Sequence, residues 1–378
     1  MEKYFKTTLE ALKTKEYKDV YIFLGNQSGD LDSAVSSLAY AMFSYWKYNQ
    51  TKIIQEEDNI KDDLFVAVYN IDRSEYKNKT EVVFCFKEQG IKENNLVFRD
   101  EIDLEALAKE TTLKVILVDH HQLAHRDLFL KDYVTEIVDH RPMYTTDYSK
   151  EQAIKWKVRI VASCCTNVLD IIREVSAFLE EFQVCAELLH CTILLDTANL
   201  SDELKRWTDA DVEALEFLEG ILKPKDFKAE RKIKYEKLMQ ARADVSSMEP
   251  DVLIGKDLKI VGDILVPSFP ILVQDFLKHP GAINAVRKTM VSKGCTIAVL
   301  LGTSLTGTIK KDVLIYTPDL KPKAKKLAEF LMGYSTKKFQ LEFDAAYSIV
   351  EHSFYYHQRN LQASRKDYTY CINHFLEA

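Results

Sequence analysis

Acidic residues and histidines follow apolar, strand-like runs at three places in this chain of 378 residues. The three segments are YIFLGNQSGDLDS (21–33), VILVDHH (115–121) and TEIVDHRP (135–142). In a parallel sheet the loops at the carboxyl ends of the strands line one crevice, so we expect these segments to converge on a single site. A fourth segment, TILLDTANLS (192–201), places Asp196 after an apolar run that could be helical.

The first segment carries Asp30 and Asp32 on a loop bounded by glycine, directly before a predicted helix. Two neighbouring carboxylates repel each other unless a cation lies between them. Together with Asn26 they supply the oxygen ligands that Mg²⁺ and Mn²⁺ prefer. The alternative interpretation is that Asp32 only caps the helix that follows.

The second and third segments repeat an Asp-His pair. Asp119, His120 and His121 follow one apolar run, and Asp139 and His140 follow the next. Taken singly, each pair also fits an ordinary turn with structural histidines. Their repetition after successive strands favours one site that combines carboxylate and imidazole groups.

The elements that would position these residues alternate between strand and helix in the first half of the chain, which favours an α/β fold with a largely parallel sheet. The expected strands cover residues 20–24, 64–69, 82–86, 115–118 and 134–138, and the expected helices cover residues 31–48 and 104–109. Periodic helical patterns then cover residues 168–182, 184–195 and 209–222.

A second domain is expected after the highly charged segment KPKDFKAERKIK (223–234), which we interpret as a linker. This gives one domain over residues 1–222 and a smaller α/β domain over residues 235–378. The expected strands of the second domain cover residues 258–266, 296–301 and 313–316, and its expected helices cover residues 269–277 and 323–331.

Composition excludes several classes of protein. The net charge of −7 argues against a broad surface for nucleic acid or anionic lipid. The seven cysteines include no C-x-x-C pair, which is typical of a reducing compartment and not of a disulfide framework or zinc site. No stretch approaches the ~20 apolar residues of a membrane span. We therefore expect a cytoplasmic protein with neither nucleic acid nor membrane as a partner.

The motifs GNQSGDLDS, VDHH, VDHR and LLD, in this order, resemble the four motifs of the DHH phosphoesterase superfamily. The second domain resembles the DHHA2 type, and it contains an SRK sequence at residues 364–366. Asn in the first motif and DHR in the third make the chain most similar to the Prune-type exopolyphosphatases. The resemblance implies an N-terminal DHH domain, with a mainly parallel sheet flanked by helices, and a DHHA2 domain that binds substrate.

The resemblance also implies a centre with two divalent cations. Its ligands would be Asn26 and Asp30 on one ion, Asp32, His140 and Asp196 on the other, and Asp119 as the bridge. Such mixed ligands suit Mg²⁺, Mn²⁺ or Co²⁺, and a hydroxide held between two ions would attack the terminal phosphate. Asp119, His120 and His121 are the expected catalytic residues, the two histidines acting as orienting or acid-base groups. Ser163 is expected near the metal ions.

Arg141, Arg365 and Lys366 are the candidates for substrate binding, because guanidinium and ammonium groups bind phosphate oxygens. Any one of them also fits an ordinary surface charge, and it is the resemblance to the DHHA2 type that singles out Arg365 and Lys366. The last two belong to the second domain, so the substrate is expected in a cleft between domains. The implied reaction is hydrolysis of short-chain polyphosphate. Pyrophosphate and cyclic nucleotides are alternative substrates, and a weakly active scaffold that binds nucleoside diphosphate kinase is the alternative function.

Two residues depart from the pattern of related pyrophosphatases. Asn26 stands where those enzymes have His, and as an oxygen ligand it would shift the preference towards Mg²⁺. Gln240 stands where they place a substrate-binding Lys. Both changes predict weaker hydrolysis of pyrophosphate.

Overall fold

The computed structural model describes residues 1–55, 61–142, 148, 152–245, 248–304, 308–319, 321–334, 339–348 and 350–377. The chain forms two compact units, Met1–Leu238 and Met239–Ala378. The border between them falls inside helix α9 (Phe227–Ala243). Residues 227–234 of the expected linker are therefore helical.

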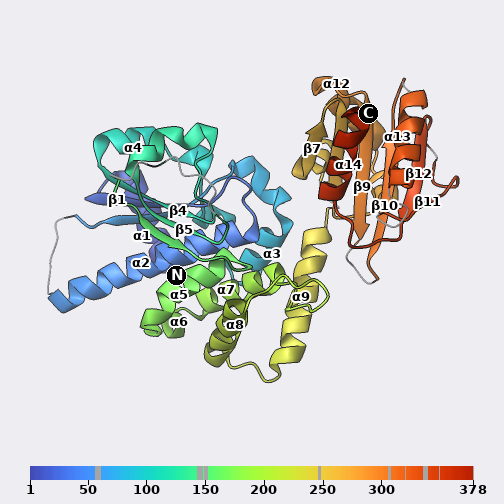
Figure 1. The fold of residues 1–378 in the computed structure, drawn as a ribbon. Helices are drawn as coiled ribbons and strands as arrows, with labels where there is room; N and C mark the ends of the chain where they lie inside the picture. The colour runs from blue at the N-terminus through green and yellow to red at the C-terminus, as the bar shows by residue number, and fades with distance from the viewer. Residues whose placement is uncertain are drawn as a thin grey trace. The chain divides into compact units, whose positions relative to one another are not determined.

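The first unit is built on a sheet of six parallel strands in the order β3-β2-β1-β4-β5-β6 (Figure 1). The strands are β1 (Asp19–Leu24), β2 (Leu64–Tyr69), β3 (Val97–Phe98), β4 (Thr112–Val118), β5 (Val134–Asp139) and β6 (Lys155–Val158). This confirms the predicted parallel sheet. Strands β1, β4 and β5, which precede the three polar segments, are direct neighbours, so their carboxyl ends meet at one edge of the sheet.

Helices cover both faces of this sheet. They are α1 (Glu2–Thr14), α2 (Leu31–Gln55), α3 (Thr80–Glu88), α4 (Leu104–Glu110), α5 (Cys164–Ile172), α6 (Ala177–Glu181), α7 (Gln183–Asp196) and α8 (Asp209–Leu222), with 3₁₀ turns η1 (Arg73–Asn78), η2 (Glu93–Asn95), η3 (Arg99–Glu101), η4 (His125–Tyr133) and η5 (Arg173–Val175). Ile22 and Leu24 of β1 share a buried cluster with Leu104 of α4. Phe23 points to the opposite face and contacts Tyr40 of α2, with ring centroids 5.1 Å apart.

Residues 82–86 form part of helix α3, so the prediction of a strand there was wrong. In the helix, Val82, Cys85 and Phe86 lie at helical spacing and are all buried. A short apolar run fits a buried strand and a buried helix equally well, because length and not periodicity separates the two. The packing against the rest of the unit decides for the helix.

The second unit has a mixed sheet of six strands in the order β11-β12-β10-β9-β8-β7, in which only β8 and β9 pair in parallel. The strands are β7 (Leu258–Val261), β8 (Ile264–Phe269), β9 (Ile297–Ser304), β10 (Lys310–Tyr316), β11 (Leu341–Phe343) and β12 (Ser353–Gln358). The helices are α10 (Pro250–Lys256), α11 (Val273–Phe276), α12 (Ala282–Ser292), α13 (Lys321–Tyr334) and α14 (Arg365–Glu377). The predicted second α/β domain is thereby confirmed as a fold.

The predicted helix over residues 269–277 was wrong at its beginning. Phe269 ends strand β8, and the helix α11 covers only Val273–Phe276. Pro270 follows Phe269, and a residue before proline is driven towards extended backbone. This local restriction explains why the strand continues to that point.

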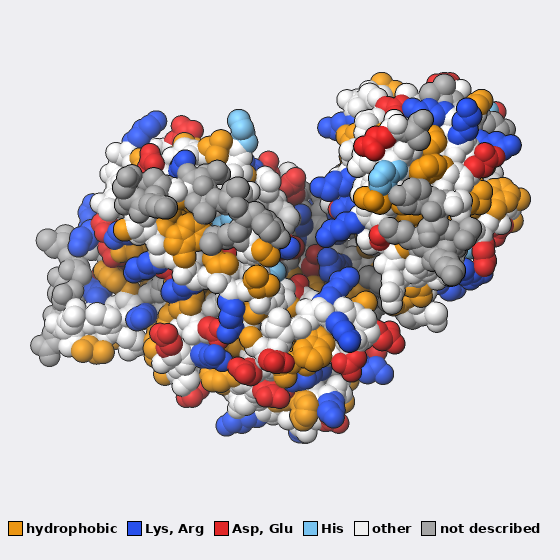
Figure 2. All heavy atoms as spheres, viewed as in Figure 1, with side chains coloured by type: hydrophobic (Ala, Val, Ile, Leu, Met, Phe, Trp, Pro, Cys, Tyr) orange, Lys and Arg blue, Asp and Glu red, His pale blue; other side chains and the backbone are white. Residues whose placement is uncertain are grey.

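None of the described helices combines the length and the apolar character that crossing a membrane requires. On the face of Met1–Leu238 shown in Figure 2, acidic and basic side chains are interspersed. The charged side chains visible there therefore do not form a continuous acidic or basic surface.

Candidate metal centre

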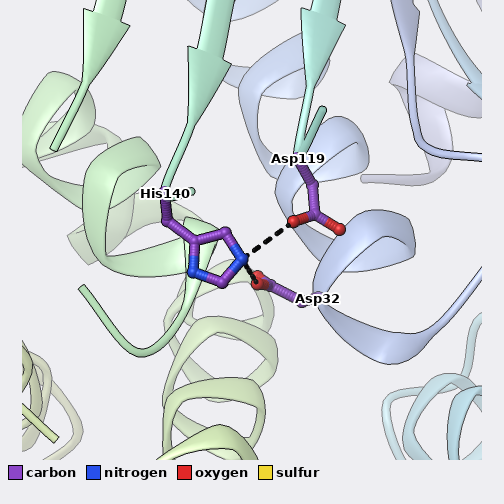
Figure 3. Close-up of side chains that lie close together, drawn as sticks. All are labelled: Asp32, Asp119 and His140. Atoms are coloured by element: carbon purple, nitrogen blue, oxygen red, sulfur yellow. Dashed lines mark ion pairs between the residues drawn. The ribbon is translucent and has the colours of Figure 1, made fainter. Parts of the chain in front are cut away.

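Three of the predicted ligands converge at the carboxyl ends of β4 and β5 (Figure 3). Asp119 follows β4, His140 follows β5, and Asp32 lies in the first turn of α2. The His140 Nε2 atom lies 3.2 Å from Asp119 Oδ1 and 3.8 Å from Asp32 Oδ2. The three side chains are buried, and each offers a ligand atom within 4.8 Å of the others.

The bonding of His140 leaves a lone pair directed at the two carboxylates. Its Nδ1 atom lies 3.0 Å from the Val161 carbonyl oxygen, an acceptor, so Nδ1 carries the proton of the neutral ring. Nε2 and the Asp119 Oδ1 atom are buried and find no hydrogen-bond partner in the described part of the chain. An unprotonated nitrogen that faces buried carboxylate oxygens is unfavourable in isolation, whereas a divalent cation between them would satisfy all of them. The donor set therefore fits a metal ion.

Asp32 is held by the beginning of helix α5. Its Oδ1 atom accepts hydrogen bonds from Ser163 Oγ (2.9 Å) and from the Cys165 backbone N–H (2.9 Å), and its Oδ2 atom accepts one from the Cys164 N–H (2.6 Å). A helix N-terminus carries partial positive charge, which stabilises this buried carboxylate. The expectation that Ser163 lies near the site is confirmed.

Asp30, and not Asp32, is the residue that caps helix α2. Its carboxylate accepts a hydrogen bond from the Ser33 N–H at 3.1 Å, and its carbonyl accepts one from the Ala34 N–H at 3.0 Å. The alternative interpretation of Asp32 as a mere helix cap is therefore wrong. Asp32 is instead free to face His140.

Asp196 ends helix α7 and joins the same group of acids. Its Oδ2 atom is buried and has no hydrogen-bond partner among the described residues. Burial raises the pKa of Asp196 well above its usual range, and the charges of Asp32 and Asp30 raise it further. Asp196 thus adds a third buried acid to the surroundings of Asp32 and Asp119, and its role as a metal ligand stays a prediction.

The electrostatics of the group favour a bound cation. Burial, with the charges of Asp32 and Asp30 second, raises the pKa of Asp119 well above its usual range. Burial also raises the pKa of Asp32, although the neighbouring His140 and the N–H groups of α5 act in the opposite direction. These raised pKa values mean that ionising Asp32, Asp119 and Asp196 is unfavourable in the metal-free protein, because the charges are buried and repel one another. A divalent cation would offset that cost.

Asn26 makes contact with Asp119 through its amide nitrogen. Nδ2 donates to the Asp119 Oδ2 atom at 2.5 Å. The amide oxygen faces its own loop and accepts hydrogen bonds from the Ser28 N–H, the Ser28 hydroxyl and the Gly29 N–H, at 2.9, 2.6 and 3.2 Å. The loop lies close to α2 because Gly25 has no side chain, since an added Cβ would lie 2.4 Å from Ser33 Oγ.

The two histidines of the second motif have different environments. His121 Nδ1 contacts the carboxylate of Asp139 at 2.5 Å, and Asp139 is fully buried. His120 Nδ1 lies 3.0 Å from the Val118 carbonyl oxygen, and burial lowers the pKa of His120. His120 is therefore neutral at pH 7. The acid-base role predicted for these histidines remains a prediction.

The predicted substrate-binding cations lie in both units. Arg141 directly follows His140, is exposed, and lies near enough to lower the pKa of Asp119. In the second unit, Arg365 begins α14 and donates to the Asp257 carbonyl oxygen at 2.7 Å. The side chain of Lys366 is exposed. Phosphate binding by these three residues remains a prediction.

Sequence reasoning missed the groups that hold the ligands in place. Asp139 was recognised only as part of a motif, yet its Oδ1 atom also accepts a hydrogen bond from the His140 N–H at 2.6 Å. The Val161 carbonyl and the N–H groups of Cys164 and Cys165 are main-chain groups. Every residue has such groups, so the sequence does not show which of them bind a ligand side chain. The available signal was Ser163 directly before a predicted helix, since serine is a preferred cap.

Comparisons with known proteins identify relatives of this chain. Residues 236–370 match the family model of the DHHA2 domain. The chain is 36 % identical to "Exopolyphosphatase PRUNE1" of Rattus norvegicus over 290 residues, which are 75 % of this chain and 59 % of that protein. It is 33 % identical to the Bos taurus protein of that name over 291 residues, or 76 % of this chain and 60 % of that protein.

The chain thus spans about three fifths of the length of these relatives. A solved structure from Methanococcus jannaschii, assigned to the family II inorganic pyrophosphatases, shares the fold. It has a TM-score of 0.52 and 16 % identity, and the match covers 94 % of this chain and 99 % of that one. Residues 236–370 are a DHHA2 domain, and the chain is a homologue of the PRUNE1 exopolyphosphatases over three quarters of its length.

Proposed function

We propose that this protein is a phosphohydrolase that uses divalent cations to cleave phosphoric anhydride bonds, with short-chain polyphosphate as its substrate. The observation that carries the proposal is the buried cluster of Asp32, Asp119 and His140, in which Asp119 Oδ1 and His140 Nε2 have no hydrogen-bond partner among the described residues. The exopolyphosphatase activity for which the PRUNE1 relatives are named supports the choice of substrate.

The residues proposed to hold a cation are Asp32, Asp119, His140 and Asp196. When bound, a divalent cation supplies Lewis acidity, which lowers the pKa of a coordinated water and neutralises charge on the phosphoryl oxygens. A second cation, as the family resemblance implies, would rely on Asp30. Carboxylates with one imidazole suit Mg²⁺, Mn²⁺ and Co²⁺.

The residues around the cluster have distinct tasks in this proposal. The N–H groups at the N-terminus of α5 favour the ionised form of Asp32, and the Val161 carbonyl keeps the proton of the neutral His140 ring on Nδ1. The pair of His121 Nδ1 with Asp139 leaves the other ring nitrogen of His121 to transfer a proton to or from the substrate. Arg141 is proposed to bind a phosphoryl oxygen.

Release of phosphate by the full chain, with formation of AMP as the readout for cyclic AMP, tests the proposal. Tripolyphosphate, pyrophosphate and cyclic AMP are each incubated with Mg²⁺, Mn²⁺ or Co²⁺, and with EDTA as the metal-free control. We expect phosphate release from tripolyphosphate that stops with EDTA. Cleavage of cyclic AMP in preference to tripolyphosphate would show that polyphosphate is not the substrate. Absence of hydrolysis with every metal ion would refute the proposal that the protein is an enzyme.

Replacing both cations at the beginning of α14, as Arg365→Ala/Lys366→Ala, is expected to raise the Michaelis constant for tripolyphosphate. Hydrogen bonds to charged groups contribute about 1.5–3 kcal/mol each, so the pair should cost at least about tenfold. The turnover number should change less. The matched control is Lys325→Ala/Lys326→Ala, which removes two exposed charges from α13. Equal Michaelis constants for the two double variants would exclude Arg365 and Lys366 from substrate binding.

The alternative function is a scaffold with little activity, and the expected partner, nucleoside diphosphate kinase, belongs with it. Gln240, on α9, is exposed and stands where related pyrophosphatases place a cation. The intact cluster of buried ligands favours the enzyme. The partnership stays a prediction that co-purification of the two proteins would test.

A further inference from the structure

We propose that Asn26 positions Asp119 and does not bind a metal ion, so that Asp119 presents only its Oδ1 atom to a single tightly held cation. This inference rests on the proposed metal centre and goes beyond it, because it changes the expected number of tightly bound ions and the role of one residue. It replaces the expectation that Asn26 is a ligand and that Asp119 bridges two ions equally.

The amide oxygen of Asn26 has no free capacity for a cation. It accepts hydrogen bonds from three donors of its own loop, two on Ser28 and one on Gly29. An amide oxygen has two lone pairs, so three donors already saturate it. The backbone N–H of Asn26 is also engaged, because it donates to Ser33 Oγ at 2.7 Å.

The amide nitrogen of Asn26 fixes one half of the Asp119 carboxylate. It donates to Oδ2 and also lies 3.4 Å from the Asp119 carbonyl oxygen. The other oxygen, Oδ1, is buried without a partner and faces His140 Nε2 at 3.2 Å. The two oxygens of Asp119 therefore have separate tasks, one bound by Asn26 and one directed at the cluster with His140 and Asp32.

Turning the amide to present its oxygen to a cation would break this arrangement on both sides. The three loop donors would lose their acceptor, and the Asp119 Oδ2 atom would face an amide oxygen in place of an N–H group. The Ser28 donors are exposed and can turn to water, so the main cost falls on the buried Asp119 carboxylate, where one acceptor would face another. A cation that used Oδ2 of Asp119 would have to displace the hydrogen bond from Asn26.

The surroundings hold both residues in these positions. Asp119 has a left-handed backbone conformation with φ of 66°, and its N–H donates to the Val138 carbonyl at 2.8 Å. The Gly25 carbonyl, directly before Asn26, accepts a hydrogen bond from Asn70 at 2.9 Å. A residue keeps an unfavourable backbone conformation when the surrounding structure holds it there. Here that conformation directs the Asp119 carboxylate towards the cluster.

The test is a titration of the metal-free full chain with Mn²⁺. Isothermal titration calorimetry measures the affinity, and electron paramagnetic resonance measures the free Mn²⁺ and hence the number of bound ions. We expect one tightly bound ion per wild-type chain. Asn26→Ala should still bind one ion, but about 10–100-fold more weakly, as for other groups that orient metal ligands. The control Gln27→Ala changes an exposed neighbour on the same loop and should leave the affinity unchanged.

Two results would overturn the inference. One is a wild-type chain that binds two ions with similar affinity and loses one of them in Asn26→Ala, which is how a ligand behaves. The other is an Asn26→Ala variant with unchanged affinity. Circular dichroism establishes that the variant is folded, and Asn26→Ser provides the same test if it is not. Because the titration contains no substrate, a failure of polyphosphate hydrolysis would refute the proposed function without altering this result.

Discussion

Asp119→Asn is expected to lower the hydrolysis of tripolyphosphate by roughly 10³-fold, because loss of a preorganised electrostatic group at a reacting centre typically costs 10²–10³. The variant keeps the size of the side chain but removes its charge and one oxygen that faces the cluster. Asp119 is 3 % exposed and its Oδ1 atom lies 3.2 Å from His140 Nε2, so the lost oxygen is one that lies inside the buried cluster. The measurement is kcat/KM from phosphate release, together with the Mn²⁺ affinity.

Asp132→Asn is the matched control, since it removes the same charge from an exposed position on η4. Its activity should equal that of the wild type. Should Asp119→Asn retain more than about a tenth of the wild-type kcat/KM while it binds Mn²⁺ as tightly, the proposed centre would not be the place of catalysis.

The second large effect concerns the stability of the metal-free chain. Burial raises the pKa values of Asp32, Asp119 and Asp196 in the folded state. The folded chain therefore holds more protons than the unfolded chain once the pH exceeds about 4, the usual carboxyl pKa. The free energy of unfolding then falls as the pH rises, by up to about 1.4 kcal/mol per pH unit for each proton that the folded state binds and the unfolded state does not.

Urea unfolding in EDTA, followed by tryptophan fluorescence between pH 5 and 9, measures this fall. Trp46, Trp156 and Trp207 all lie within Met1–Leu238 and so report on the unit that holds the acids. Saturating Mg²⁺ should restore stability most at high pH, where the carboxylates are ionised.

The comparison with Asp119→Asn isolates the acids from other titrations. Burial lowers the pKa of His120, so this residue makes an opposite contribution, in which stability is lost as the pH falls through the usual histidine pKa of about 6.5. This contribution is common to both chains and cancels in their difference. We expect the decline with pH to be less steep in Asp119→Asn, and an equal slope in the two chains would show that Asp119 is not strained when ionised.

The placement of the ligands could be predicted from sequence because their signals are local. Apolar runs marked β1, β4 and β5, and the rule for parallel sheets brought their carboxyl ends together. The same local signals failed where two structures share one pattern. Residues 82–86 are a helix, and the cap of α2 is Asp30, although Asp32 was the residue considered for that role.

The amino-acid sequence by itself determined which side chains follow the strands, namely Asp119 and His140 directly after β4 and β5 and Asp32 in the helix after β1, and therefore the kind of ion that they suit. Only the tertiary structure decided which atom of each side chain is available. Asn26 donates to Asp119, a residue 93 positions away, and His140 is oriented by a main-chain carbonyl. Hydrogen bonds between such distant groups depend on how the chain folds back on itself, and residue type and spacing do not contain that information.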